Sequence, residues 1–312
     1  MSGDPLTVGL VVNMPDGALQ ATERQFRDLL SNAAGERTLR LRLFAIPEVP
    51  RSPEGRAYVR AHCEDIAALW PAELDGLIVT GTEPKAAHLT AEPYWPALAR
   101  LIDWVEGRGI ATVWSCLAAH AAVYRLDGIE RRRFGRKLSG LFDCAVERPH
   151  PLIEGCGTGW RVPHSRLNDV PEEALAAHGY RILSRADAVG ADLFVKEAGA
   201  LHLFVQGHLE YDGDTLGREY RRDVKRFLRG ERGEYPELPR DCFSDEMTAA
   251  LLEFRALARH RRDAALMRHF PPLPAAIAPW RGVAARLYGN WLDGLDRGRR
   301  AAPPAEAMRL AV

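Results

Sequence analysis

The first half of the chain alternates apolar, strand-like runs with segments of helical periodicity. The predicted strands cover residues 6–13, 39–46, 76–80 and 110–115, and the helices cover 20–32, 58–70, 94–106 and a segment after Cys116. Helices of this length between strands form right-handed crossovers, which make the strands parallel within one sheet. Ligands of such a sheet bind beyond the carboxyl ends of its strands. We therefore expect Asn13, Thr80, Gly81 and Cys116 at the ligand-binding edge.

The second half contains shorter elements. Strand-like runs occur at 180–184, 193–196 and 200–205, and the chain is mainly helical from Asp214 onward. With 312 residues, 46% of them hydrophobic, the chain can bury one large core. We therefore expect a single domain over residues 1–298 and a C-terminal tail over residues 299–312.

Composition argues against several classes of protein. Lys plus Arg and Asp plus Glu each number 42, so no net positive charge points to nucleic acid. No segment is apolar enough to cross a bilayer and no signal-peptide pattern is present, so we expect a cytoplasmic enzyme without a membrane partner. The five cysteines form no C-x-x-C pair and the ten histidines are scattered, so we expect neither a disulfide framework nor a metal site.

Cys116 follows the apolar run 110–115 and precedes a helical segment. A strand-to-helix turn displays its first side chain at the edge of the sheet, and the positive end of the helix dipole favours a thiolate there. This placement is typical of a nucleophile. Because free cysteine is also among the most buried residue types, a buried structural cysteine is the alternative interpretation.

A second apolar run, at 201–206, ends in Gly207 and His208, and Glu210 lies two residues further on. In an extended chain, residues i and i+2 project to the same side, so Glu210 can orient the His208 ring and stabilise its protonated form. A cysteine, a histidine and a glutamate at strand ends can act as nucleophile, base and orienting group. The sequence therefore predicts Cys116, His208 and Glu210 as catalytic residues.

Several short motifs accompany these residues. They are Val79-Thr-Gly81, Tyr94-Trp95, Lys137-Leu-Ser-Gly140, Pro163-His-Ser-Arg166, Gly207-His-Leu-Glu-Tyr-Asp212, Asp214-Thr-Leu216, Glu219-Tyr-Arg-Arg-Asp223 and Asn290-Trp-Leu292. In this order, over roughly residues 7 to 295, they resemble the homoserine O-acyltransferase (transsuccinylase) family of methionine biosynthesis. The resemblance implies a class I glutamine amidotransferase-like fold, which is an α/β, flavodoxin-like, doubly wound and mostly parallel sheet with C-terminal helices.

The resemblance also implies a ping-pong acyl transfer that needs no cofactor and uses an acyl-CoA as co-substrate. Cys116 would take the acyl group as a thioester, and His208, held by Glu210, would deprotonate the hydroxyl of L-homoserine as it attacks that thioester. N–H donors near the turn between Cys116 and Leu117 would stabilise the oxyanion. Serine or another hydroxy amino acid is the alternative acceptor. Related enzymes are homodimers, and we expect the same here.

The family's amino-acid-binding positions fall on Lys137, Ser165 and Arg222, and Arg166 and Glu219 lie close by in the sequence. Arg222 suits a bidentate contact with the acceptor's carboxylate, and Glu219 suits its ammonium group. Without the resemblance, Glu219 and Arg222 would be interpreted as an i,i+3 ion pair on a helix surface.

The chain departs from the family in two places. The family has Trp-Gly-Ala-Gln after the cysteine, whereas this chain has Leu117-Ala-Ala-His120. His120 falls one helical turn after Cys116, either as a second proton carrier or as a packed histidine. The loop after the first strand lacks the family's paired lysines, so other residues must make their contacts, such as contacts to coenzyme A phosphate or to the oxyanion.

Lys85 occupies the position at which family members that use succinyl groups have Gly and those that use acetyl groups have Glu. A cation there would attract the succinyl carboxylate, so we expect succinyl-CoA rather than acetyl-CoA as the donor. A lysine that points to solvent is the alternative.

Two other functions are compatible with Cys116, His208 and Glu210. A glutamine-hydrolysing amidotransferase uses the same residue types, although the motifs at 137–140 and 163–166 fit it poorly. A non-catalytic binding protein that kept the fold is the third possibility.

Overall fold

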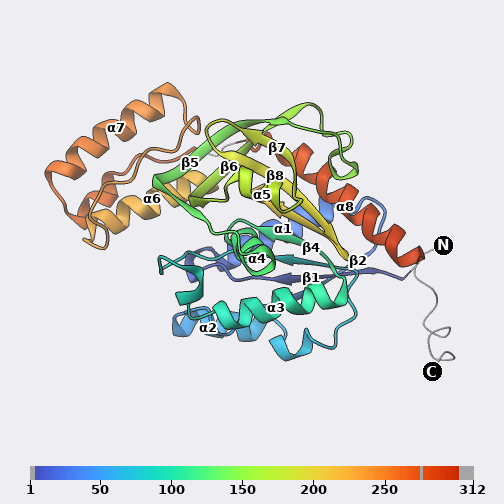
Figure 1. The fold of residues 1–312 in the computed structure, drawn as a ribbon. Coiled ribbons are helices and arrows are strands. Elements are labelled where there is room, and N and C mark those ends of the chain that lie inside the picture. The colour runs from blue at the N-terminus through green and yellow to red at the C-terminus, as the bar shows by residue number, and fades with distance from the viewer. Residues whose placement is uncertain (1–3, 275–276, 302–312) are drawn as a thin grey trace.

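The computed structural model describes residues 4–274 and 277–301, which form a nine-stranded sheet covered by helices (Figure 1). The strands are β1 (Leu6–Val11), β2 (Leu39–Phe44), β3 (Gly76–Val79), β4 (Ala111–Ser115), β5 (Arg132–Val146), β6 (Gly159–Asp169), β7 (Arg181–Ala186), β8 (Gly190–Ala198) and β9 (Ala200–Val205). The α-helices are α1 (Asp16–Ala34), α2 (Pro53–His62), α3 (Trp95–Arg108), α4 (Leu117–Asp127), α5 (Glu172–Ala177), α6 (Thr215–Leu228), α7 (Asp245–His260) and α8 (Arg281–Ala301).

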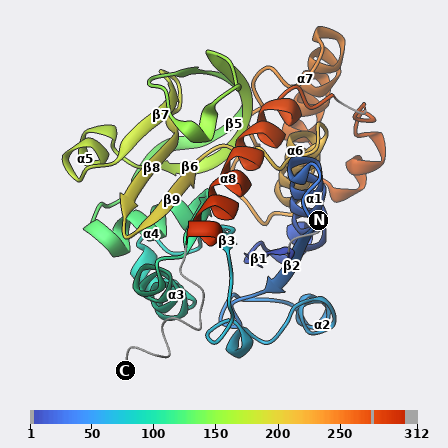
Figure 2. The same cartoon turned by 90° about the vertical axis from the view of Figure 1, so that its right-hand side faces the viewer.

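One half of the sheet is parallel. Its strands lie in the order β2-β1-β3-β4-β9, and each neighbouring pair is parallel. Figures 1 and 2 show α1 and α8 on one face of this half and α3 on the other. The predicted α/β class with a doubly wound parallel sheet is thereby confirmed.

The inner parallel strands β1, β3 and β4 are largely apolar on both faces because helices cover both faces. Leu10 and Ile78 belong to the core that includes α1 and α8, whereas their neighbours Val11 and Val79 belong to the core that includes α3 and α4. Successive strand residues therefore feed two cores, and none of these four is more than 1% exposed.

The other half of the sheet is antiparallel, in the order β9-β8-β7-β5-β6. The sequence predicted β7, β8 and β9 but not the long hairpin of β5 and β6. The first part of β5 is polar and largely exposed, and its register with β6 shifts between Arg133 and Leu138. Regular alternation, the signal that reveals a strand in a sequence, is therefore absent there.

The chain after β9 is helical, as predicted. Helices α6 and α7 form a third core, to which Tyr220 of α6, Phe254 of α7 and Phe270 contribute. Helix α8 runs to Ala301, so residues 299–301 of the predicted tail are helical, and residues 302–312 lie outside the described residues. In the part of the chain that the structure describes, no helix has the length and apolar character needed to cross a membrane.

Candidate active site

Cys116 lies in a strained turn between β4 and α4. Its φ of 52° and ψ of −112° place it in a region that residues with a side chain rarely adopt, at a typical cost of about 1–3 kcal/mol. The Cys116 N–H donates to the Val205 carbonyl at the end of β9, over 2.7 Å. This bond and the start of α4 hold the turn, so the half-buried thiol stands at the carboxyl edge of the sheet.

The remaining four cysteines differ from Cys116 in setting. All five are free thiols, but only Cys116 lines the cavity described below. Burial raises the pKa of Cys63 to about 11 and that of Cys242 to about 12, and it also raises the pKa values of Cys144 and Cys156. Those four thiols are therefore protonated at neutral pH.

A cavity of about 630 Å³ opens beside Cys116. Its wall also contains His208, Tyr211, Ser165 and Gly81. Seven basic side chains and four acidic ones line it: Lys85, Arg133, Lys137, Arg166, Arg222, Arg226 and Arg232 against Glu83, Glu219, Asp223 and Glu231. The cavity is thus rich in positive charge although the whole chain is neutral.

His208 and Glu210 form a buried pair after β9, next to β4 in the sheet. The Nδ1 atom of His208 lies 2.8 Å from Oε1 of Glu210, and each side chain is 5% exposed. Burial alone would lower the pKa of His208, but the Glu210 carboxylate and the Cys116 sulfur outweigh it and hold that pKa well above its usual value. The structure thus brings Cys116, His208 and Glu210 together.

Two backbone N–H groups at the Cys116 turn are available as hydrogen-bond donors. A Cβ at Gly81 would come within 2.8 Å of the Leu117 nitrogen, so glycine is what lets these two backbones approach. Neither the Gly81 nor the Leu117 N–H has a hydrogen-bond partner among the described residues. Asn13 and Thr80 support this edge by bonding to each other, the Asn13 N–H donating to Thr80 Oγ1 over 2.8 Å.

Glu219 lies in the cavity wall with three donors around its carboxylate. Tyr211 donates its hydroxyl to Oε1 over 2.7 Å, Ser165 donates its hydroxyl to Oε2, and the Lys137 ammonium lies 3.2 Å from Oε2. Burial raises the pKa of Glu219, but Lys137 and Arg222 lower it more, to about 2. The glutamate is therefore a permanent anion facing the cavity.

Asp223 is surrounded by basic groups. Arg222 lies 3.0 Å from its carboxylate, Lys137 3.3 Å, Arg232 3.7 Å and Arg226 4.0 Å.

The Glu219 side chain is only 15% exposed and pairs with Lys137. The alternative of a simple surface pair between Glu219 and Arg222 is therefore wrong.

Arg166 reaches the same cavity but is occupied by the protein. Its side chain is 1% exposed, and it donates to Asp169 over 2.9 Å, to the Asn168 carbonyl over 3.0 Å and to His164 Nδ1 over 3.3 Å. These bonds fix the guanidinium as part of the wall.

His120 is a packed histidine. It is 2% exposed, and its Nε2 lies 2.8 Å from the Gln206 side-chain oxygen. Burial lowers its pKa to about 3, so the ring is neutral at physiological pH. Of the two interpretations of His120, the structure favours packing over proton transfer.

Lys85 lies in an exposed loop and lines the cavity. Its backbone N–H donates to Glu92 Oε1 over 2.7 Å, which fixes the loop. Its ammonium group has no ion-pair partner within residues 4–274 and 277–301.

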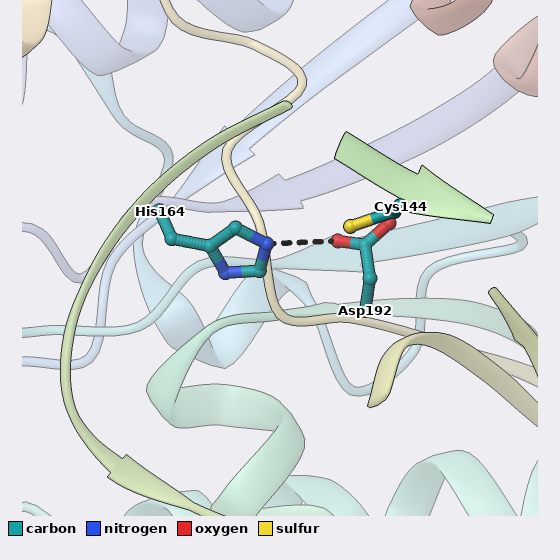
Figure 3. A group of neighbouring side chains, drawn as sticks. All are labelled: Cys144, His164 and Asp192. Atoms are coloured by element: carbon teal, nitrogen blue, oxygen red, sulfur yellow. Dashed lines mark ion pairs between the residues drawn. The ribbon is translucent and has the colours of Figure 1, made fainter. Parts of the chain in front are cut away.

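A buried cluster of Cys144, His164 and Asp192 contains residue types that bind metals, which the sequence did not indicate (Figure 3). Asp192 accepts hydrogen bonds from Trp160 over 3.1 Å and Ser184 over 3.0 Å, and lies 3.3 Å from His164 Nε2. Because Arg166 donates to Nδ1 of His164, the proton of this neutral ring is on Nε2. Neither His164 Nε2 nor Asp192 Oδ1 has a hydrogen-bond partner among the described residues, although the two atoms are only 3.3 Å apart. The cluster therefore contains a close polar contact between His164 and Asp192 rather than a hydrogen bond. Its members come from separate strands, so no sequence spacing could reveal it.

The sheet, with a cysteine in a strained turn at its carboxyl edge and a His–Glu pair at the next strand, has a class I glutamine amidotransferase-like fold. A glutamine amidotransferase from Methylobacillus flagellatus has a similar fold, with a TM-score of 0.53 and 16% identity over 93% of this chain and 94% of that one. Another from Thermotoga maritima has a TM-score of 0.50 and 11% identity over 94% and 98%.

Sequence comparison is more specific. The model of the homoserine O-succinyltransferase family matches residues 2–295. A homoserine O-succinyltransferase of Methylorubrum extorquens is 51% identical over 92% of this chain and 86% of its own length, and one of Bradyrhizobium japonicum is 47% identical over 94% and 91%. The chain belongs to the homoserine O-succinyltransferase family.

Proposed function

We propose that this protein transfers a succinyl group from succinyl-CoA to the hydroxyl of L-homoserine, as a step of methionine biosynthesis. Membership of the family supports the reaction. The observation that carries the mechanism is that Cys116 and His208 share one cavity with the anion Glu219 and the cation Arg222, while Glu210 contacts the His208 ring.

In the first half-reaction, His208 takes the proton of the Cys116 thiol and the sulfur attacks the thioester carbonyl of the donor. The N–H groups of Leu117 and Gly81 stabilise the resulting oxyanion. The intermediate then expels the CoA thiolate, which takes the proton from His208. The enzyme is left with a succinyl thioester on Cys116.

In the second half-reaction, His208 takes the proton of the acceptor's hydroxyl as its oxygen attacks the Cys116 thioester. The second oxyanion collapses, expels the Cys116 thiolate and yields the O-succinyl ester, and the proton on His208 returns to the sulfur. Glu210 keeps the His208 ring oriented and stabilises its charge in both steps.

The acceptor's charged groups match the cavity wall. The Arg222 guanidinium can bind its carboxylate, and the Glu219 carboxylate can bind its ammonium, with Lys137 and Ser165 holding Glu219 in place. Arg166 acts as a positioning residue, because its donors are already used within the protein.

Lys85 provides the basis for donor choice. Its ammonium lines the cavity without a carboxylate partner among the described residues, and a succinyl group carries a carboxylate where an acetyl group has none. We further propose that the enzyme works without a cofactor, as a homodimer in the cytoplasm, as in related enzymes.

Intact-protein mass spectrometry tests this function. After incubation with succinyl-CoA, we expect a mass gain of one succinyl group that Cys116→Ala abolishes and that Cys242→Ala, a half-buried cysteine outside the cavity, leaves intact. Acetyl-CoA should label less, and Lys85→Glu should reverse this preference.

The second step is tested on the labelled enzyme. Homoserine should remove the label. Removal by serine but not by homoserine would identify serine as the acceptor instead. No label from any acyl-CoA, combined with ammonia release from glutamine, would instead identify an amidotransferase. No label and no ammonia would point to a binding protein.

A further inference from the structure

The mouth of the cavity contains more basic groups than its own carboxylates neutralise. The Asp223 carboxylate contacts Arg222, Arg232 and Lys137, so a single negative charge lies among three cations. Arg226 is paired separately, with Glu83 over 2.9 Å. A cavity with this charge distribution favours an anionic ligand.

Arg133 and Arg232 mark the solvent side of this cavity. Arg133 lies on β5, is exposed, and has no ion-pair partner in the described part of the chain. Arg232 follows α6, is 33% exposed, and its nearest carboxylate, Asp223, is 3.7 Å away. His208 is only 5% exposed, so the reacting groups lie inside and these two arginines lie at the entrance.

We propose that Arg133 and Arg232 bind the phosphate groups of the coenzyme A donor. This inference rests on the proposed function, because it assigns the nucleotide end of the same donor. The acceptor is a zwitterion and the succinyl group has one carboxylate, so neither supplies the several negative charges that this entrance can hold. The nucleotide end of coenzyme A, with its diphosphate and a further phosphate on the ribose, supplies these negative charges.

The residue type also fits. Guanidinium groups bind phosphate through two parallel N–H donors and remain charged at all relevant pH values. The loop after β1, which begins Asn13-Met-Pro-Asp16, has no lysine. The positive charge for the donor therefore comes from arginines on β5 and after α6, and not from the loop after β1.

Two donors that differ only in the nucleotide separate this role from catalysis. Succinyl-CoA carries the phosphates, and succinyl-N-acetylcysteamine carries the same thioester without them. We expect Arg133→Gln and Arg232→Gln each to lower the ratio of kcat/KM for succinyl-CoA to kcat/KM for the short donor about tenfold, mainly through KM for succinyl-CoA. Arg136→Gln is the matched control, since it removes an exposed arginine from the same strand outside the cavity wall.

An unchanged ratio in both variants, or an equal fall with Arg136→Gln, would overturn the proposal. Calorimetry with adenosine 3′,5′-bisphosphate and, separately, with inorganic phosphate gives a readout that needs no turnover. We expect the bisphosphate to bind the full-length protein and the double variant to bind it at least tenfold more weakly. Equal binding by both proteins would refute the site, as would phosphate competing equally well.

The two proposals can fail separately. If the wild-type protein transfers no acyl group from either donor but binds the bisphosphate through Arg133 and Arg232, the nucleotide site stands and the acyl-transfer function falls. If transfer occurs and the donor ratio is insensitive to both arginines, the function stands and the site falls.

Discussion

His208 shows how a few side chains set the chemistry of this site. Burial disfavours a charged imidazole, yet Glu210 and Cys116 hold its pKa well above the usual value. The charge that His208 gains when it takes the Cys116 proton is thereby stabilised, and the same proton is then available for the leaving CoA thiolate. Conversely, the neutral ring of His120 cannot replace it as a proton donor, since its pKa is about 3.

Replacing Glu210 by Gln keeps the shape and removes the charge. Because Glu210 is the strongest group that raises the pKa of His208, we expect the titration of His208 to move to lower pH, and kcat to fall on the order of 10²-fold. Histidine NMR across a pH series and steady-state kinetics measure both effects. Glu197→Gln, an exposed carboxylate that pairs with Arg181, is the control. A His208 titration that does not move would show that another group sets its charge.

At the scale of elements, the turn after β9 is held by β6 and β8. The His208 N–H donates to the Pro163 carbonyl over 2.7 Å, and the Gln206 N–H donates to the Asp192 carbonyl over 2.8 Å. Between them, Gly207 lies against His164 and Asp192. The position of the catalytic base therefore depends on how these strands pack.

Gly207→Ala tests this packing. The added Cβ would lie 2.7 Å from Val162 Cγ2 and 2.8 Å from Asp192 Oδ1, so the turn must shift and carry His208 with it. We expect a loss of about 1–3 kcal/mol in the free energy of unfolding and a clear fall in kcat. Urea unfolding and kinetics measure these. Gly107→Ala, in α3 with open space around its Cα, should leave kcat unchanged. Wild-type kcat in Gly207→Ala would contradict the argument.

The sequence predicts well those elements whose residues repeat a regular pattern. The strands and helices of the parallel half, and Cys116 and His208 at neighbouring strand ends, follow from apolar runs that stop at defined residues. The β5–β6 hairpin could not be predicted because its start is polar and its register shifts at Arg133. The His164–Asp192 pair could not be predicted either, since only the folded sheet brings those strands together.

For the whole molecule, α8 connects the end of the described chain to its beginning. It packs along α1 (Figure 2). Trp291 is fully buried and lies against Gly76 of β3. Arg299 donates to the Asp4 carbonyl over 2.9 Å. This helix therefore stabilises the fold at a distance from the cavity, whose wall includes none of its residues.

Trp291→Ala separates stability from activity. Removing a fully buried indole should cost about 3–5 kcal/mol of unfolding free energy, because a cavity remains in the core. The kcat of the folded fraction should stay close to that of the wild type. Thermal unfolding and kinetics at low temperature measure this, with Leu252→Ala, a 47% exposed position, as control. A lower kcat at full folding would link α8 to the site.

Lys137 lies beside the carboxylate that is proposed to bind the acceptor's amino group. Its ammonium already contacts Glu219 over 3.2 Å, where the proposed substrate's ammonium would bind. The acceptor's ammonium would therefore share the Glu219 carboxylate with Lys137, and little binding free energy is gained from the amino group alone. Ordinary amino acids, which offer the same head group, would be weak inhibitors, and selection among them falls on the hydroxyl that meets the acylated cysteine.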